Sequence, residues 1–523
     1  MPNSRFGKSV LIIDYKLEEL SRLRSIVSGL GFEQVEAASS VNMAVSYLRE
    51  QAFDVVLVAY DLGKAEKNGL QVVQEAFAEK LNVFQTLFLL IIDSAYSSLL
   101  VGSLESAPDA YISRPYDRAK IQNLLEKLQR IKKAVLRVEE SMDNAQWSRA
   151  LEYCARLIDI YPGLKVYLER LQGLCLLESG SYQEAEVLFG RIVTSRKQVW
   201  AQVGQGMAFY YLGRHKEAIN ILQQVVDQQH ISVEAFSWLA RSLHVSGDLT
   251  QSIVLMRKAV LLQPYVPQLQ SEMGNLAASA EDWPLAIDAF RDVLKYSRYS
   301  VFQEPDHYFS LVRCLIAQYQ VKNGNKEELE LEALRVMESV IRDFVGDITV
   351  KFRAHLVLAE LRSVLDFEVM AEAELTQAVG LYEQFSAEDQ WRWMDWMADA
   401  ADGKPSMETV KSIKGKLLQE VNAESWVELM RAGLQHYKKG DLERAAELFF
   451  QADNADADCV SVILNFAQVI IERKSLAGNN VSQQQWAACL ARLNRLHFGA
   501  LSVKQQKRYK TLMQRYSAIY TRS

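Results

Sequence analysis

Four short polar segments near the start of the chain combine side chains that could do chemistry together. Each follows an apolar run that predicts a buried strand, and ligand chemistry in parallel α/β sheets gathers at the carboxyl ends of the strands. Carboxylate oxygens suit a hard cation such as Mg²⁺, and an arginine can pair with a carboxylate through two nitrogens. The segments are Asp14-Tyr15, Ala59-Tyr60-Asp61, Asp93-Ser94-Ala95 and Arg114-Pro115.

The elements that must position these segments alternate between strand and helix. Strands separated by helices pair in parallel through right-handed crossovers, so we expect a doubly wound α/β sheet. Short apolar runs predict strands at Ser9–Ile13, Asp54–Val58, Leu87–Ile92 and Tyr111–Ser113. Apolar residues at helical spacing predict helices at Leu17–Leu30, Ser39–Leu48, Gly69–Phe77 and Ser97–Glu105, and we expect Asp117 to cap a longer one.

Four motifs, taken in order along the chain, resemble the receiver domain of bacterial two-component response regulators. The resemblance covers about residues 7–130. It implies a flavodoxin-like fold with a five-stranded parallel sheet and a phosphorylation pocket at its carboxyl edge. The motifs are Val10–Asp14, Phe53–Gly63, Asn68-Gly69-Leu70 and Asp109–Tyr116.

This chain departs from the pocket that the resemblance implies. The family uses an aspartate acceptor, two acids that help to hold Mg²⁺, a hydroxyl and a lysine, because the metal and the cation neutralise charge on the transferred phosphoryl group. Asp14 keeps the first acid, but Tyr15 stands in place of the second. Ser94 could supply the hydroxyl, and Arg114 replaces the lysine with a planar, bidentate donor.

Two alignments are open at the phospho-acceptor position. Counting forward from Asp54 puts Ala59 there, whereas counting back from Gly69 puts Asp61 near it. The string from Ala59 to Gly63 resembles a family Asp-Tyr-Asn-Leu-Gly, which favours a vacant acceptor at Ala59. Under that alignment the domain is a pseudo-receiver and needs no cofactor. Under the other, Asp61 could be phosphorylated with Mg²⁺.

The two surviving carboxylates suggest a role for Arg114. An ion pair between Arg114 and either Asp14 or Asp61 would hold the emptied pocket in a single state, where phosphoryl and metal would otherwise switch between two. The alternative is that Arg114 points to solvent, where ion pairs are weak. A short distance from Arg114 to one of the carboxylates would support the first interpretation.

From about residue 118 the sequence becomes helical and repetitive. Small residues recur every 33 to 35 positions, with glycine or alanine twelve positions before four of them and a large apolar residue or cysteine four positions after each. This spacing resembles the tetratricopeptide repeat, in which paired helices touch at small residues. The small residues are Ala150, Ala185, Ala218, Ser252 and Ala286, and a further unit spans 426–452.

The repeat pattern and the first motifs together predict a multidomain chain, an α/β domain followed by an all-α repeat superhelix. The long helix at Lys120–Glu140 has no Gly or Pro, so it should couple the two parts stiffly. We expect a receiver-like domain at 1–128, repeats at 129–300, irregular helical repeats at 301–420, and a C-terminal repeat unit with basic capping helices at 421–523.

Stacked repeats of this type usually bind a peptide or a partner helix on the concave surface that their first helices line. The alternative for the apolar candidates is that they form the core between repeats. A tryptophan cluster, Trp391, Trp393 and Trp396, is open to the same two interpretations, a partner anchor or core packing. The groove candidates are Gln202, Gln205, Phe209, Phe236, Leu239, Gln270 and Asn275.

Charge is distributed unevenly along the chain. The net charge is −6, but the last 51 residues, from Arg473 to Ser523, carry ten Lys/Arg and no Asp/Glu. A basic end on an acidic body can attract the chain itself, an acidic partner or nucleic acid. The tail residues open to such a role are Arg492, Arg495, Lys504, Lys507, Arg508, Lys510 and Arg515.

Other function classes find no support in the sequence. The motifs GxxxxGK[ST], HExxH and GxSxG are absent, and neither the seven histidines nor the five cysteines have metal-ligand spacing. We therefore expect neither an enzyme nor a metal site. No apolar run approaches the ~18 residues that span a bilayer, and the N-terminus lacks the apolar segment of a signal peptide, so we expect a cytoplasmic protein.

These observations predict a non-enzymatic signalling adaptor. The resemblance implies that it docks to a sensor histidine kinase or a cognate regulator. The first helix, 17–30, would face the kinase, and the receiver face at 97–127 would serve dimerisation or output. We expect a protein partner rather than nucleic acid or a membrane. Two alternatives stay open: a phosphorylatable regulator that uses Asp61, and a nucleic-acid binder that uses the basic tail.

Overall fold

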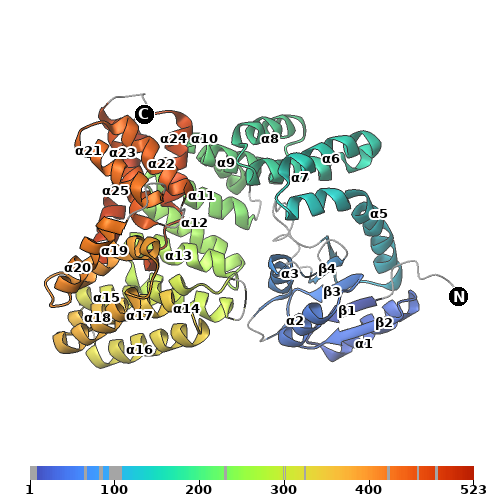
Figure 1. The fold of residues 1–523 in the computed structure, drawn as a ribbon. Helices are drawn as coiled ribbons and strands as arrows, with labels where there is room; N and C mark the ends of the chain where they lie inside the picture. The colour runs from blue at the N-terminus through green and yellow to red at the C-terminus, as the bar shows by residue number, and fades with distance from the viewer. Residues whose placement is uncertain are drawn as a thin grey trace.

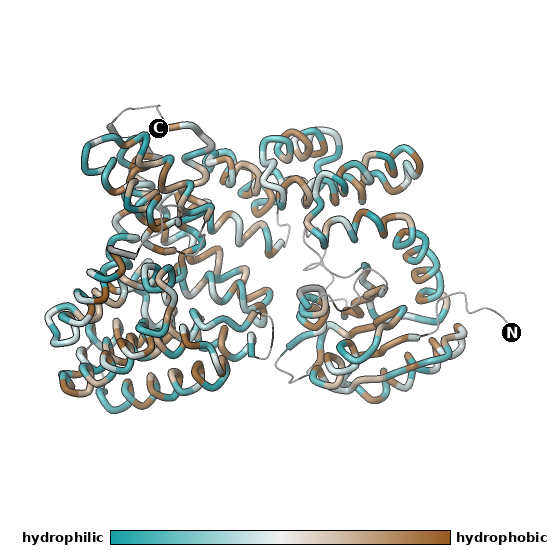
Figure 2. The backbone as a smooth tube through the Cα atoms, in the orientation of Figure 1, coloured by the Kyte–Doolittle hydropathy of each residue, from teal (hydrophilic) through white to brown (hydrophobic). Residues whose placement is uncertain are grey.

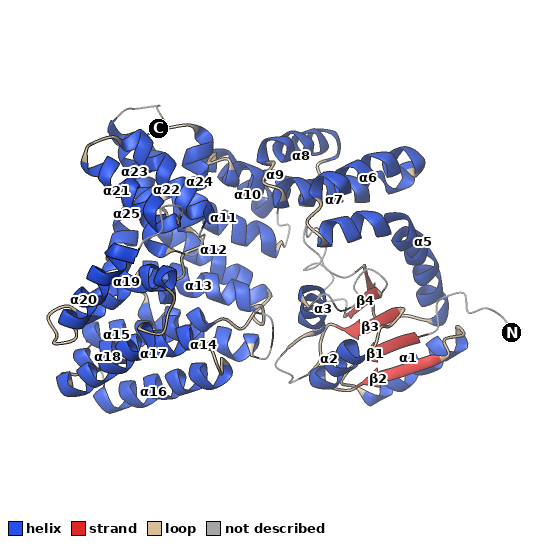
Figure 3. Ribbon diagram, viewed as in Figure 1, coloured by secondary structure: helices blue, strands red, loops and turns tan. Residues whose placement is uncertain are grey.

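The computed structural model describes residues 9–63, 67–79, 81, 86–93, 109–228, 232–298, 300, 302–322, 325–420, 425–455, 459–476 and 481–522. An α/β part with a single sheet is followed by a long array of helices (Figures 1 and 3). In this described part, no helix is both long enough and apolar enough to cross a membrane.

The sheet has five parallel strands in the order β2-β1-β3-β4-β5. This is the order of the flavodoxin-like folds, and the predicted α/β fold class is confirmed. The strands are β1 (Ser9–Ile13), β2 (Gln34–Ala38), β3 (Val55–Ala59), β4 (Leu87–Ile92) and β5 (Ala110–Ser113). The helices between them are α1 (Leu17–Gly29), α2 (Val41–Glu50) and α3 (Gly69–Ala78), and the helix expected at 97–105 lies outside the described residues.

The alternation of side chains along the buried strands builds two cores, one on each face of the sheet. Leu11 and Val56 pack toward α2 and α3, whereas Val10 and Leu57 pack toward α1 and the following long helix. The strands β1, β3 and β4 are apolar along their whole length, apart from Ser9 at the start of β1 (Figure 2), because both faces of the sheet are covered there. Parallel sheets in α/β proteins have this arrangement.

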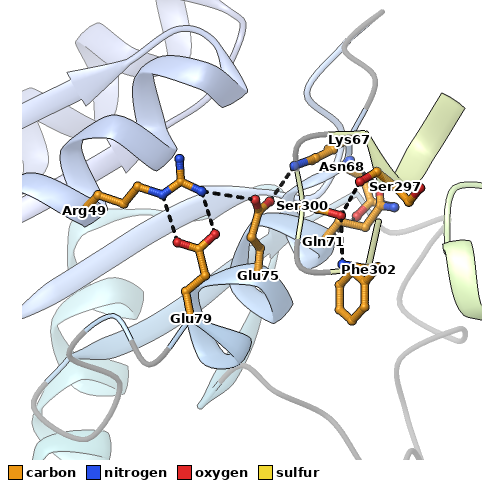
Figure 4. A network of polar contacts seen from close by, with 9 residues as sticks. All are labelled: Arg49, Lys67, Asn68, Gln71, Glu75, Glu79, Ser297, Ser300 and Phe302. Carbon is orange, nitrogen blue, oxygen red and sulfur yellow. Dashed lines mark hydrogen bonds and ion pairs between the residues drawn. The ribbon is translucent and has the colours of Figure 1, made fainter. Parts of the chain in front are cut away.

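A network of ion pairs fixes α2 against α3 (Figure 4). Arg49 donates two hydrogen bonds to Glu79, at 2.8 and 2.6 Å, and lies 3.8 Å from Glu75. Glu75 is 2% exposed and also binds the Lys67 ammonium at 2.6 Å. The buried carboxylate is therefore compensated by two cations, which is the condition under which a buried charge is tolerated.

The long helix α5 (Arg118–Asp143) belongs to both cores. Its first half, with Ile121 and Leu125, packs on the sheet, and its second half, with Val135 and Val138, packs with the first repeat helices. Asp117 caps it by accepting the Lys120 N–H at 2.7 Å. The predicted continuous helix is thus present, and it joins the two parts without a flexible linker.

The remaining described elements form the helical array, in which neighbouring helices pack in antiparallel pairs (Figure 1). They are α6 (Trp147–Ile160), η2 (Pro162–Leu164), α7 (Lys165–Glu178), α8 (Tyr182–Arg196), α9 (Val199–Tyr211), α10 (His215–Asp227), α11 (Val233–Ser246), α12 (Leu249–Leu262), α13 (Pro267–Ser279), α14 (Trp283–Ser297), α15 (Pro305–Lys322), α16 (Lys326–Asp343), α17 (Ile348–Val364), α18 (Glu368–Tyr382), α19 (Ala387–Ala401), α20 (Met407–Glu420), α21 (Trp426–Lys438), α22 (Leu442–Ala455), α23 (Val460–Leu476), α24 (Gln483–Leu493), η3 (Phe498–Ala500) and α25 (Val503–Arg522).

The glycines of the repeat pattern lie where paired helices touch. A Cβ atom on Gly173 of α7 would lie 2.4 Å from the ring of Phe189 of α8, so only glycine permits this approach. The same contact recurs through the array, as the spacing predicts. The further pairs are Gly206 with Leu222, Gly274 with Phe290, and Gly433 with Phe449.

The tryptophan cluster belongs to the core of the array. Trp396 is 3% exposed, and the ring centroids of Trp393 and Trp396 are 5.8 Å apart. The guanidinium of Arg313 lies 4.4 Å from the Trp396 ring, and that of Arg353 lies 5.3 Å from both rings. These contacts favour core packing over the partner-anchor interpretation because Trp396 has almost no surface to offer.

Candidate functional site

The carboxyl ends of the strands bring the predicted pocket residues together. Ile13 of β1 lies level with Val58 of β3, and Ile92 of β4 lies level with Ser113 of β5. Asp14, Asp93 and Arg114, which follow these strands, therefore meet at one edge of the sheet. Ala59, the last residue of β3, lies there as well, paired with Ile91.

Arg114 crosses this edge and binds the carboxylates around it. Its Nη2 lies 2.6 Å from Asp14 Oδ2, its Nη1 lies 3.2 Å from Asp93 Oδ1, and its Nε lies 3.7 Å from Glu19 Oε2. The ion pair expected between Arg114 and one of the two carboxylates is present, and its partner is Asp14. The alternative that Arg114 points to solvent is wrong, since its side chain is 18% exposed.

The pocket is partly dehydrated, and this affects its charges. Burial raises the pKa of Asp14, while the hydrogen bond from the Lys16 N–H and the charge of Arg114 oppose that rise only in part. Burial alone would lower the pKa of Arg114, but its contacts with Asp93 and Asp14 outweigh burial and raise it. Arg114 is therefore a permanent cation at this edge.

The residue at the end of β3, Ala59, carries a methyl group and no carboxylate. Ala59 is fully buried, and its carbonyl oxygen approaches α3 so closely that a Cβ on Gly69 would lie 1.9 Å from it. Asp61 lies two residues beyond the strand, where its Oδ1 accepts the Gly63 N–H at 2.8 Å. The Asp61 carboxylate is thus engaged in a turn of its own loop.

Tyr15 does not contribute an acid or a metal ligand of the usual type. Its side chain is 40% exposed and leans on Gly63, where a Cβ would lie 2.9 Å from the ring. Ser94, the predicted hydroxyl, lies outside the described residues. Mg²⁺ prefers several oxygen ligands, and in the described pocket Asp14 already has its carboxylate bonded to Arg114.

Most of the predicted groove residues are packed inside the array. Gln202, Phe209, Leu239 and Gln270 are all less than 9% exposed. The side-chain amide of Gln270 donates a hydrogen bond to the Pro264 carbonyl at 2.9 Å. The Arg214 guanidinium lies 4.4 Å from the centroid of the Phe209 ring. These side chains join successive repeats and offer little surface to a partner. Gln205 and Phe236 are half-buried.

Asn275 differs, because it contacts another part of the chain. Its Oδ1 accepts the N–H of Phe498 at 3.3 Å, and its Nδ2 lies 3.4 Å from His497 Nδ1. The segment around Phe498 lies against α13, α15 and α17, where Asn275, Ser310 and Arg353 form hydrogen bonds with it. Sequence patterns gave no sign of this contact, which joins residues 223 positions apart.

Two cavities flank the place where this segment meets the array, with volumes of about 500 and 510 Å³. His244 lines both and His307 the first, and burial lowers the pKa of each histidine to about 4, so both imidazoles are neutral at pH 7. The walls common to both cavities are His244, Asn275, Ser279, Leu496 and Tyr509.

Five of the seven candidate residues of the basic tail are paired with acids of the same chain, and Arg508 donates to the side-chain oxygens of Asn465 and Gln468. Asp453, 3% exposed, accepts Arg492 at 2.5 Å and Arg495 at 3.1 Å. The possible targets of the tail's positive charge were the chain itself, an acidic partner and nucleic acid. These ion pairs are with the chain itself. Further pairs are Lys504 with Asp402 and Asp399, Lys510 with Glu281, and Arg515 with Glu472.

Comparison with known proteins supports the repeat assignment. Residues 203–267 match the tetratricopeptide repeat. No curated protein matches the chain. Among solved structures, the chain is similar to the C-terminal part of a TPR repeat-containing protein from Cytophaga hutchinsonii, with 16% identity over 48% of this chain and 95% of that one, at a TM-score of 0.37. A tetratricopeptide repeat protein from Parabacteroides merdae is 12% identical over 65% of this chain and 99% of that one, at a TM-score of 0.30.

The matched repeats indicate a scaffold for protein–protein interaction. The matched residues 203–267 include most of α9 and all of α11, and the tail contacts these two helices at Tyr210 and Val245. At the carboxyl edge of the N-terminal sheet, Arg114 binds the carboxylates of Asp14 and Asp93.

Proposed function

We propose that this chain is a non-enzymatic signalling adaptor, in which a pseudo-receiver domain is joined to a protein-binding repeat scaffold. Its partner would be a sensor histidine kinase or a cognate regulator of a two-component system in the cytoplasm. The proposed divisions are 1–128 for the pseudo-receiver, 129–300 for the first repeats, 301–420 for the irregular helices and 421–523 for the C-terminal unit. The strand order and the ordered receiver motifs support this reading.

The observation that carries the proposal is the vacancy at Ala59. Ala59 ends β3 and lies level with Asp14, because Ile13 pairs with Val58. An aspartyl phosphate at this place needs a carboxylate oxygen, and alanine has none. The register therefore favours Ala59 over Asp61 as the acceptor position, and the turn that engages Asp61 favours it further.

Arg114 gives the pocket a single electrostatic state. In a switching receiver, a phosphoryl group and a metal change the charge of the pocket. Here the guanidinium neutralises Asp14 and reaches Asp93 without either. The domain would then present a constant surface to its partner, and signalling would proceed by competition for that partner.

Acetyl phosphate with Mg²⁺ tests this proposal on the full chain. We expect the intact mass to stay unchanged, with a phosphorylatable receiver protein in the same tube as the control. A gain of one phosphoryl group that is lost in Asp61→Ala would overturn the pseudo-receiver and establish the phosphorylatable alternative.

A binding experiment tests the partner class. Purified sensor kinases and response regulators from one bacterial genome are passed over the immobilised full chain. We expect saturable binding of at least one of them, unchanged by acetyl phosphate. No binding by any would contradict the two-component context while leaving the repeat scaffold in place.

A further inference from the structure

The segment 494–501, between α24 and α25, lies against helices of the array that are distant from it in the sequence. Its side chains and backbone form hydrogen bonds with residues of α9, α13, α15 and α17. Only one turn, η3 (Phe498–Ala500), is regular. In these four contacts the two partners are 146 or more positions apart in the sequence.

The array holds the segment by its backbone. Asn275 Oδ1 accepts the N–H of Phe498 at 3.3 Å, and Ser310 Oγ accepts the N–H of Gly499 at 2.8 Å. Arg353 Nη2 donates to the carbonyl of Gly499 at 3.3 Å. Three side chains from α13, α15 and α17 thus read the main chain of two consecutive residues, as in domains that bind extended peptides.

Glycine is required at position 499 by space. A Cβ there would lie 2.3 Å from the carbonyl oxygen of Asp306 and 2.7 Å from the backbone nitrogen of Ser310. These are backbone atoms of a packed helix, which cannot rotate away as a side chain can. The preceding residue presents its ring to Trp283, with 6.1 Å between centroids. The groove therefore fits an aromatic residue followed by glycine.

The segment fills its groove incompletely. The two cavities beside it, of about 500 and 510 Å³, are walled on one side by the array and on the other by the tail. The tail is therefore tightly packed at Gly499, whereas the two cavities beside it are partly open to solvent.

We infer that residues 494–501 are an intramolecular ligand of a peptide-binding groove. The groove would otherwise accept a partner protein's extended peptide of the same chemistry, an aromatic residue followed by glycine. The inference rests on the proposed function as a protein-binding scaffold and names the partner chemistry of that scaffold. A partner must displace the tail, so its apparent affinity is reduced by the small fraction of open groove.

Two variants of the full chain open the groove in different ways. Gly499→Ala places a methyl group against the backbone of α15, and Phe498→Ala removes a half-buried ring without adding an atom. Gly415→Ala is the matched control, because a Cβ at Gly415 of α20 meets nothing within 4 Å. Circular dichroism melting confirms that each variant is folded before binding is measured.

The probe is a fluorescein-labelled peptide of residues 493–503, and the readout is fluorescence anisotropy. We expect Phe498→Ala and Gly499→Ala to bind it about tenfold more tightly than wild type or more, and Gly415→Ala to bind it as wild type does. A peptide carrying alanine in place of glycine should bind none of them. Adding Asn275→Ala to Phe498→Ala should weaken the binding again.

Equal peptide binding by wild type and both folded opening variants would overturn the inference, as would no binding by either variant. The segment would then be a fixed cap of the array. Neither result touches the adaptor proposal, which the mass and partner-binding experiments test separately.

Discussion

Arg114 Nη2 lies 2.6 Å from Asp14 Oδ2 across the carboxyl ends of β1 and β5. Asp14 is 1% exposed, so its carboxylate depends on this guanidinium and on the Lys16 N–H for compensation. Breaking a pair of this kind from one side is costly because the remaining charge loses its partner. Removing both partners is less costly, since no orphan charge is left.

This ion pair predicts that substitutions of Arg114 and Asp14 have non-additive effects on the free energy of unfolding. Arg114→Ala should lower the local free energy of unfolding of the sheet by about 1–3 kcal/mol. The double variant with Asp14→Asn should lose less than the sum of the two single variants. Native-state hydrogen exchange of peptides from β1 and β5 measures each value. Strict additivity would show that the contact contributes no coupling.

The junction between the sheet and the first repeat predicts a pH dependence. Lys132 Nζ lies 2.9 Å from Asp109 Oδ1 and 3.3 Å from Glu139 Oε2, and the Tyr167 hydroxyl lies 3.4 Å from Glu139 Oε1. Burial raises the pKa of Glu139 from 4.5 to about 7. Between these values the folded state binds more protons than the unfolded state, so stability falls as pH rises.

We therefore expect the junction to lose up to about 3 kcal/mol of stability between about pH 5 and pH 8. Hydrogen exchange of α5 and α7 peptides, corrected for the intrinsic exchange rate, measures the change. Glu139→Gln keeps the shape and removes the titration, so its stability should be nearly flat over this range. A wild-type profile as flat as that of Glu139→Gln would contradict the prediction.

The glycine contacts of the repeats predict opposite effects for two similar substitutions. The Phe189 ring is fully buried between Gly173 and Gly204, so a methyl group on Gly173 cannot be relieved by moving the ring. Gly173→Ala should destabilise the array by about 1–3 kcal/mol. Gly380→Ala, where a Cβ meets nothing within 4 Å, should stabilise α18 by up to about 1 kcal/mol. Urea unfolding followed by circular dichroism compares them.

The sequence predicts features that depend on local spacing. The sheet follows from short apolar runs, and the repeat contacts follow from a glycine and a large residue 16 positions apart, as in Gly173 and Phe189. The edge strand β2 (Gln34–Ala38) was not predicted from the sequence because it has no continuous apolar run. It pairs with β1 alone and is mostly half-exposed.

Features that depend on contacts between residues far apart in the sequence could not be predicted from residue spacing. The choice between Ala59 and Asp61 needed the register of β1 against β3. The tail–groove contact joins Asn275 to Phe498, and charge patterning predicted attraction without saying which of three targets the tail would meet. The groove candidates came from repeat position, which does not distinguish a side chain on the concave surface from one between helices.

The ion pairs of Asp453 predict how stably α24, which precedes the segment 494–501, is held against the array. Its buried carboxylate accepts Arg492 Nε and Arg495 Nη2, and the Arg492 guanidinium also lies 4.7 Å from the Phe450 ring. Asp453→Asn removes the charge that both cations share and leaves Arg492, 13% exposed, without its ionic partner. We expect a loss of about 1–3 kcal/mol in the stability of α24.

Limited proteolysis measures this loss, because Arg492 of α24 and Arg495, just after this helix, become cleavable by trypsin when α24 detaches from the array. Asp453→Asn should accelerate cleavage after Arg492 and Arg495, and about 0.5 M salt should accelerate it less in the variant than in wild type. Glu408→Gln is the matched control, since Glu408 pairs only with Lys411 on its own helix among the described residues. Equal cleavage rates in Asp453→Asn and wild type would mean that apolar packing alone, and not this carboxylate, holds the tail against the array.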